Sequence, residues 1–140
     1  MQLFIGGSNQ KKLNIVLADI LKNDKINEDL IFDCASDYAD FTIYADAMTK
    51  FRIINHFHVF IRRFYGKFDT ENAIENFFSD ILEKNPELII IGDEIGYGIV
   101  PIDKDERLFR ENYGRVMCCL AKKACKVTRI VCGLSQVIKQ

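Results

Sequence analysis

A short, unbroken apolar run from Leu88 to Ile91 constrains the fold of this chain more than any other feature. A run this short and rich in β-branched residues predicts a strand buried on both faces, as in a parallel sheet. The run stops at Gly92-Asp93-Glu94, and open α/β sheets bind their ligands at the carboxyl ends of their strands. We therefore expect Asp93 and Glu94 to lie at a binding site, although two acids in this position also occur as a simple solvated turn.

The remaining apolar patterns predict strands that alternate with helices. Apolar runs predict strands at 2–5, 30–32 and 127–132, with an edge extension at 137–139. Helical periodicity predicts one helix that begins at Asn14 and three more that cover 47–65, 70–85 and 103–123. The stretch 37–46 gives no assignment. The order β-α-β-α-α-β-α-β predicts an α/β fold with three layers, in which a mostly parallel sheet carries helices on both faces.

Length and composition point to one globular domain over residues 1–140. Of the 140 residues, 28% are charged and 49% are hydrophobic, and the net charge of −1 implies no pull toward nucleic acid or a membrane surface. No apolar run reaches membrane-spanning length, and Met1 leads directly into a strand, so we expect a cytoplasmic protein. The five cysteines form no Cys-x-x-Cys pair, which argues against structural zinc.

The turn after the first strand has the layout of a phosphate-binding loop. Its sequence is Gly-Gly-Ser-Asn-Gln-Lys-Lys-Leu over residues 6–13, followed directly by a helix. The full motif is Gly-x-x-x-x-Gly-Lys-Ser/Thr, which Gly6 and Lys12 match. Lys11 replaces the second glycine, and Leu13 replaces the hydroxyl residue that usually binds Mg²⁺. Glycine turns between a strand and a helix are also common without any phosphate, so both interpretations remain open.

If the loop binds phosphate, its backbone and its lysines are the contacting groups, because helix N-termini and loop N–H groups attract anions. The expected nucleotide-binding residues are Gly6, Gly7, Ser8, Lys11 and Lys12. The expected ligands for Mg²⁺ are Asp93 and Glu94.

The two histidines of the chain, His56 and His58, fall in the predicted helix 47–65. Residues two apart on a helix point about 200° apart, so we expect that they do not share a ligand. A structural histidine at a helix edge is the alternative to a chemical role for either one.

Three stretches of the sequence together resemble the bifunctional adenosylcobinamide kinase/adenosylcobinamide-phosphate guanylyltransferase family of cobalamin biosynthesis. They are Leu-Phe-Ile-Gly-Gly at 3–7 with Lys12; Glu-Ile-Gly-Tyr-Gly-Ile-Val-Pro at 94–101; and Phe109-Arg110, Gly114-Arg115-Val116, Val131-Cys132-Gly133-Leu134 and Ile138-Lys139. The second stretch is similar to the family's Asn-Glu-Val-Gly-x-Gly-Ile-Val-Pro, and order and spacing agree through the C-terminal third.

The resemblance implies a P-loop NTPase-like fold and an enzyme that uses ATP or GTP with Mg²⁺. It implies that the protein transfers a phosphoryl or guanylyl group to adenosylcobinamide or its phosphate. Lys12 would hold phosphates, and Glu94 would act as a catalytic or metal-binding acid. His56 would be the guanylylated nucleophile, because Arg52-Ile53-x-x-His56 resembles the family's helical Arg-Ile-x-His-His. The family also implies a homo-oligomer, usually a trimer.

The alternative is a non-catalytic nucleotide-binding paralogue that acts as a sensor or binds a partner. It rests on Lys11 and Leu13, which depart from the loop motif, and on a chain shorter than family members. The resemblance implies that one strand–helix segment is absent between the histidine segment and the strand at 88–91.

Overall fold

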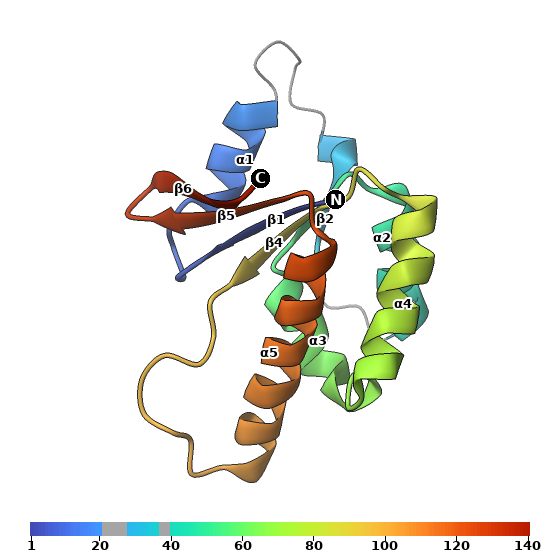
Figure 1. The fold of residues 1–140 in the computed structure, drawn as a ribbon, viewed down its shortest axis with the longest axis vertical. Coiled ribbons are helices and arrows are strands. Elements are labelled where there is room, and N and C mark those ends of the chain that lie inside the picture. Colours follow the sequence, from blue (N-terminus) through green and yellow to red (C-terminus); the bar gives the residue numbers. More distant parts are fainter. Residues whose placement is uncertain (21–27, 37–39) are drawn as a thin grey trace.

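Over the residues that the structure describes, the protein is an α/β structure built on one six-stranded sheet (Figure 1). The structure is a computed structural model, and it describes residues 1–20, 28–36 and 40–140. The strands are β1 (Gln2–Gly6), β2 (Ile31–Asp33), β3 (Ile53–Asn55), β4 (Ile89–Asp93), β5 (Lys126–Val131) and β6 (Leu134–Lys139). They pair in the order β2-β3-β4-β1-β5-β6, and every pairing is parallel except that between β5 and β6. The predicted mostly parallel sheet is therefore confirmed.

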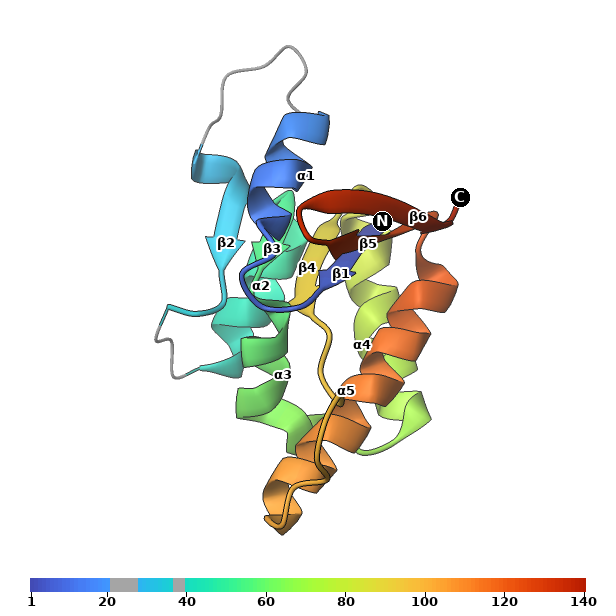
Figure 2. The same cartoon turned by 90° about the vertical axis from the view of Figure 1, so that its left-hand side faces the viewer.

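Helices cover both faces of the sheet unequally (Figure 2). The helices are α1 (Lys12–Ile20), α2 (Phe41–Lys50), α3 (Phe57–Phe64), α4 (Glu71–Lys84) and α5 (Lys104–Lys123), and short 3₁₀ turns occupy Glu28–Leu30 and Tyr65–Lys67. Helix α1 packs on one face, where Val16 joins a small cluster of strand residues. The other four helices contribute to a much larger cluster on the opposite face. None of the helices in the described ranges is both long and apolar enough to cross a membrane.

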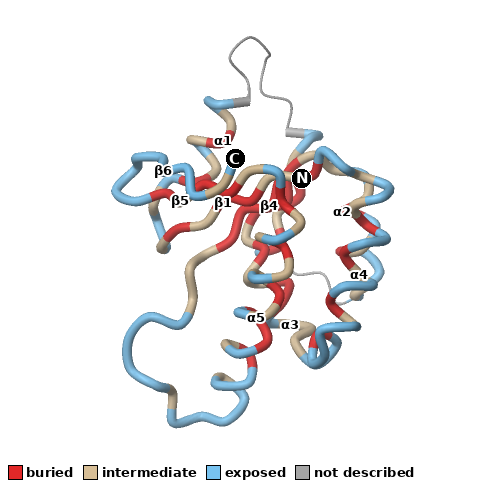
Figure 3. Tube along the Cα trace, viewed as in Figure 1, coloured by how far each residue is buried: buried red, intermediate tan, exposed pale blue. Residues whose placement is uncertain are grey.

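Strand β4 lies inside the sheet and is buried on both faces, as its apolar run predicts (Figure 3). Ile90 belongs to the cluster under the four helices, whereas Ile89 and Ile91 belong to the cluster under α1. Because successive side chains of a strand point to opposite faces, only a strand covered on both sides can be apolar at every position.

The predicted helix over 47–65 is wrong. Residues 41–50 form α2, Ile53–Asn55 form β3, and the next helix starts only at Phe57. Ile53 packs in the cluster under α1 and Ile54 in the cluster under the four helices, which is the alternation of a strand. Pairing with β2 on one side and β4 on the other supplies the hydrogen bonds that outweigh the helical pattern of the flanking residues.

The other helix ends follow their capping residues. Thr70 accepts a hydrogen bond from the backbone N–H of Ala73 and begins α4, and Asp103 accepts from Asp105 and Glu106 and begins α5. The stretch 37–46 that gave no assignment contains the first residues of α2, which Asp40 caps; residues 37–39 lie outside the described part.

Gly6 ends β1 where the neighbouring backbone leaves no room for a side chain. A Cβ there would lie 2.5 Å from the carbonyl oxygen of Ile130 in β5. We expect Gly6→Ala to lower the free energy of unfolding by about 2–3 kcal/mol, since a backbone atom must move. Gly7→Ala is the matched control: its nearest neighbour would be Gln10 Cγ at 3.7 Å, and we expect a change below about 0.5 kcal/mol. Urea unfolding followed by circular dichroism measures both, and equal stabilities would contradict the expectation.

Candidate nucleotide-binding site

A pocket of about 470 Å³ opens at the carboxyl ends of β3 and β4, beside the loop that leaves β1. Residues from the loop and the first turn of α1 form one wall, and the ends of β3 and β4 with the start of α3 form the other. The lining residues are Ser8, Asn9, Gln10, Lys11, Lys12, Leu13, Asn14, Asn55, His56, His58, Ile91 and Asp93. The pocket therefore occupies the edge of the sheet where α/β proteins bind ligands.

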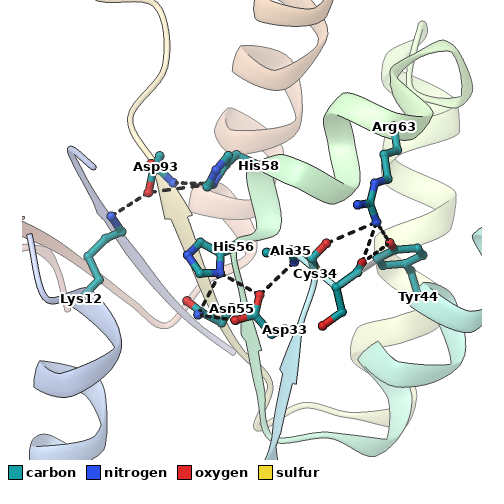
Figure 4. Close-up of polar contacts among 11 residues, drawn as sticks. Lys12, Asp33, Cys34, Ala35, Tyr44, Asn55, His56, His58, Arg63 and Asp93 are labelled. Atoms are coloured by element: carbon teal, nitrogen blue, oxygen red, sulfur yellow. Dashed lines mark hydrogen bonds and ion pairs between the residues drawn. The ribbon is translucent and has the colours of Figure 1, made fainter. Parts of the chain in front are cut away.

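Lys12 joins the loop to the central strand (Figure 4). Its Nζ donates to the carbonyl oxygen of Gly7 at 2.7 Å and lies 2.6 Å from Asp93 Oδ1. Ser8 Oγ donates to the other carboxylate oxygen of Asp93 at 2.7 Å. Only 9% of the Lys12 side chain is exposed, so its charge is held at the floor of the pocket.

Lys11 takes the backbone conformation that the motif's second glycine adopts freely. Its φ angle is +58°, in the left-handed region that costs residues with a Cβ about 1–2 kcal/mol. Asn9 has the same φ of +58°. The loop thus keeps a turn that suits glycine although lysine occupies the position, and the exposed Lys11 side chain lies at the pocket.

The Asp93 carboxylate is ionised in this setting. Burial opposes its ionisation, but the hydrogen bonds from Lys12 and Ser8 outweigh burial and hold its pKa below the ordinary value. The backbone around it is also fixed, because Tyr113 donates its hydroxyl to the carbonyl oxygen of Asp93 at 2.7 Å.

His56 lies at the end of β3 and not inside a helix. It is the N-cap of α3, with a left-handed φ of +50°. Its Nδ1 lies 2.7 Å from Asp33 Oδ1, and Asn55 Nδ2 donates to Asp33 Oδ2 at 3.2 Å. Ala35 N–H donates to Asp33 Oδ1 at 2.8 Å. Burial opposes ionisation of Asp33, but these contacts hold its pKa below the ordinary value.

His58 enters the same pocket, so the expectation that the two histidines point apart is wrong. Their ring centroids are 5.9 Å apart. The expectation assumed a continuous helix, whereas His56 precedes α3 and only His58 lies within it. The backbone N–H of Asp93 donates to His58 Nδ1 at 3.4 Å. Burial lowers the pKa of His58, and the Asp93 carboxylate opposes that shift.

Glu94 lies apart from the pocket that holds Lys12. Its carboxylate pairs with Arg129, with Oε1 2.9 Å from the guanidinium Nε. It lines a separate hollow, with Ile95, Tyr97 and Met117 among the neighbours. Of the expected site residues, the structure brings Ser8, Lys11, Lys12, His56 and Asp93 to one pocket. Gly6 ends β1 and Gly7 begins the loop, and neither of them lines this pocket.

The oxygen atoms next to Lys12 fit a magnesium ion better than a softer metal. Asp93 and Ser8 offer a carboxylate and a hydroxyl, the hard ligands that Mg²⁺ prefers, and Mg²⁺ usually keeps several waters. Within the described residues, no group of three or more His, Cys, Asp or Glu side chains is placed to hold a metal ion. Glu94, engaged by Arg129, does not join Asp93 there.

Sequence reasoning missed Asp33 and Asn55, which contact His56. The signal that could have found Asp33 was present: a short apolar strand, Ile31-Phe32, ends in an acid, as β4 does. Asn55 could not be found, because its segment was assigned to a helix.

The sheet is mostly parallel, its first strand runs into a lysine-bearing loop, and an ionised acid ends the adjacent strand. Together these features define a P-loop-like α/β protein. The family model of cobinamide kinase/cobinamide phosphate guanyltransferase (CobU) matches residues 9–138. The chain belongs to this family of cobalamin biosynthesis proteins, as the sequence motifs predict. A comparison with curated protein sequences gave no match.

Proposed function

We propose that this protein binds ATP or GTP with its phosphates at the loop pocket and transfers a phosphoryl or guanylyl group to a corrinoid, adenosylcobinamide or its phosphate. The observation that carries the proposal is the buried Lys12 ammonium, held between the loop and Asp93 beside a pocket of about 470 Å³. Family membership supplies the substrate class. The free thiols of all five cysteines fit a reducing compartment, and we place the protein in the cytoplasm.

The residues of the pocket divide the work of holding the phosphates. Lys12 neutralises charge at the floor, and Lys11 adds a second cation at the rim. Mg²⁺, held through Asp93 and Ser8, supplies further neutralisation of phosphate charge when bound. Such positioning and charge stabilisation account for most of the catalysis in phosphoryl transfer.

His56 is the residue that reacts in the guanylyl step. Its Nε2 forms a bond to the α-phosphorus of GTP, the bond from that phosphorus to the bridging oxygen breaks, and pyrophosphate leaves. A phosphate oxygen of the corrinoid then attacks the same phosphorus, and the phosphorus–nitrogen bond breaks. The proposal draws support from the pocket that His56 shares with Lys12, not from a helical motif. In the kinase step the corrinoid hydroxyl oxygen forms a bond to the γ-phosphorus of the nucleoside triphosphate, the bond from that phosphorus to the β,γ-bridging oxygen breaks, and the nucleoside diphosphate leaves. The hydroxyl releases its proton to water.

A second candidate is a nucleotide-binding relative without turnover. The observations that favour it are Leu13 in place of the hydroxyl residue and Glu94 engaged by Arg129 outside the pocket. Between α3 and β4, a stretch that the structure describes throughout, the chain has α4 and no further strand. Nucleotide binding without product formation is the behaviour expected of such a relative.

The test of the proposal is an assay with adenosylcobinamide, Mg²⁺ and either γ-labelled ATP or α-labelled GTP, separated by chromatography. Transfer of label to the corrinoid supports the enzyme, and Lys12→Ala supplies the inactive control. Tight nucleotide binding with no labelled corrinoid would instead support the second candidate.

Ser8 supplies the hydroxyl that Leu13 lacks. We expect Ser8→Ala to weaken nucleotide affinity in the presence of Mg²⁺ by about three- to tenfold, because one hydrogen-bonding group of about 1 kcal/mol is lost. Adding Leu13→Ser to Ser8→Ala should restore part of that affinity, since it returns a hydroxyl to the motif position. Titrations with and without Mg²⁺ measure both variants. If Ser8→Ala changes neither titration, Ser8 has no part in the site.

The proposal includes a homo-oligomer, with a trimer the form that the resemblance implies. The connection between β4 and α5 stands away from the body of the protein (Figure 1). It exposes apolar side chains almost fully: Tyr97 by 75%, Ile99 by 92% and Ile102 by 98%. Apolar surface of this kind is typical of an interaction site, and a second copy of the chain is the proposed partner.

We expect sedimentation velocity at micromolar concentration to give a species several times the chain mass of 16.2 kDa. The double variant Ile99→Asp, Ile102→Asp should sediment as a folded monomer, because both side chains are exposed in the single chain. Asn72→Asp, at an exposed position on α4, is the control. A wild-type protein that sediments only as the 16.2 kDa chain would contradict the proposal.

A further inference from the structure

The polar groups around His56 determine which of its two ring nitrogens carries the hydrogen. Asp33 Oδ1 lies 2.7 Å from Nδ1, closer than Asn55 Nδ2 at 3.1 Å. An ionised carboxylate only accepts hydrogen bonds, so Nδ1 must donate. The amide Nδ2 of Asn55 lies 3.1 Å from the same Nδ1, but it has a better acceptor in Asp33 Oδ2 at 3.2 Å.

The rest of the environment fixes Asp33 itself. Ala35 N–H holds its Oδ1, and Arg63 donates to the carbonyl oxygen of Ser36 at 2.8 Å, which ties the turn after β2 to α3. Asp33 and Asn55 occupy paired positions at the ends of β2 and β3. The carboxylate is therefore aimed at the imidazole by two strands and a turn.

We propose that Asp33 is a positioning residue that keeps the hydrogen of His56 on Nδ1 and thereby presents the Nε2 lone pair to the phosphate pocket. In Figure 4 the second ring nitrogen of His56 lies on the side of Lys12 and Asp93. The inference deepens the proposed function and rests on His56 as its reacting group. The charged and titratable groups that line the pocket with His56 are Lys11 and Lys12 from the loop and α1, Asp93 from β4 and His58 from α3.

His58 has the opposite arrangement. Its Nδ1 accepts the backbone N–H of Asp93, so in the neutral ring the hydrogen lies on Nε2. One histidine of the pocket thus offers a lone pair and the other an N–H. The first suits attack on phosphorus, and the second suits a hydrogen bond to a phosphate oxygen.

A purely structural role does not explain the Asp33–His56 pair. The side chains are 41% and 44% exposed, and ion pairs with that much solvent contribute little to stability, with a median of about 0–1 kcal/mol. The same geometry has a large effect on chemistry, because an imidazole with its hydrogen on the wrong nitrogen has no lone pair to use.

The test is an NMR spectrum that correlates ring nitrogens with ring protons, recorded without nucleotide at a pH where both rings are neutral. The chain has only two histidines, so His56→Gln and His58→Gln assign both rings. We expect the hydrogen on Nδ1 in His56 and on Nε2 in His58. In Asp33→Asn the amide can donate to Nδ1, so the His56 hydrogen should move to Nε2 while His58 stays unchanged.

The Asp33→Asn variant should also slow covalent labelling of the protein by α-labelled GTP by roughly 10²–10⁴-fold. Its affinity for GTP should stay within about threefold of the wild type. Asp46→Asn, an exposed acid paired with Lys50 on α2, is the control and should change neither readout. A wild-type His56 with its hydrogen on Nε2, or an unaltered labelling rate in Asp33→Asn, would overturn the inference. If Asp33→Asn fails to fold, the wild-type spectrum alone still tests which ring nitrogen of His56 carries the hydrogen. Absence of labelling in a wild-type protein with the expected spectrum would overturn the proposed function instead.

Discussion

His56→Gln is expected to abolish covalent labelling of the protein by α-labelled GTP. The wild-type protein should acquire label through a phosphoramidate, which is labile to acid and stable to base, because Nε2 of His56 attacks the α-phosphorus. Glutamine keeps a polar side chain of similar length at the end of β3 but has no nucleophilic nitrogen. Denaturing electrophoresis followed by autoradiography measures the label.

His58→Gln is the matched control, because His58 lies in the same pocket and 5.9 Å away between ring centroids. It should retain the label, since its own Nδ1 accepts the Asp93 N–H and its Nε2 carries the hydrogen. Loss of label in His58→Gln with retention in His56→Gln would reverse the roles of the two histidines. Labelling of neither variant nor the wild type, with GTP still bound, would leave the protein a nucleotide-binding relative.

Lys12→Ala is expected to weaken binding of ATP and GTP by at least tenfold. The substitution removes a charge-assisted contact of about 1.5–3 kcal/mol to phosphate, and about 1.4 kcal/mol corresponds to a factor of ten in affinity. It also leaves the Asp93 carboxylate, 15% exposed, without its cation. Circular dichroism at the titration temperature must therefore confirm that the variant is folded.

Lys11→Ala distinguishes the contribution of Lys11 to nucleotide affinity from that of Lys12. The Lys11 side chain is exposed at the rim, so its removal should weaken affinity less than the loss of Lys12. The same affinity in Lys12→Ala and wild type would remove the phosphate-loop interpretation.

Local sequence signals were enough to predict most of the fold. The apolar run 88–91, which ends at a glycine and an acid, predicted a strand inside the sheet, because no other environment tolerates apolar residues at every position. The predicted helices 70–85 and 103–123 correspond to α4 and α5, and the side chains of Thr70 and Asp103 cap their first turns by accepting hydrogen bonds from free N–H groups. These elements are specified by nearby residues.

Strand β3 could not be predicted in this way. Its three residues, Ile53–Asn55, sit between segments with strong helical periodicity, and its hydrogen bonds come from β2 and β4, which are distant in sequence. Because this strand was not predicted, the turn at His56 was not predicted either, nor was the approach of the two histidines to one pocket. Long-range pairing, not local propensity, determined the structure here.

Part of the candidate site could be predicted from the sequence. Asp93 ends β4, and Lys12 follows the loop that leaves β1. These two strands pair directly, so their carboxyl ends lie side by side. Glu94 comes one residue later, and its direction depended on a partner, Arg129 in β5, that no local pattern revealed. To predict the contact of Asp33 with His56, one would have to know that β2 and β3 are neighbours in the sheet.

The most direct test of the central claim, that the loop pocket is a nucleotide site, is a calorimetric titration of the wild-type protein with ATP and with GTP, in the presence and absence of Mg²⁺. The account predicts saturable binding of at least one triphosphate with one site per chain, strengthened by Mg²⁺ and weakened at least tenfold in Lys12→Ala. No binding of either nucleotide, or binding that Lys12→Ala leaves unchanged, would contradict it.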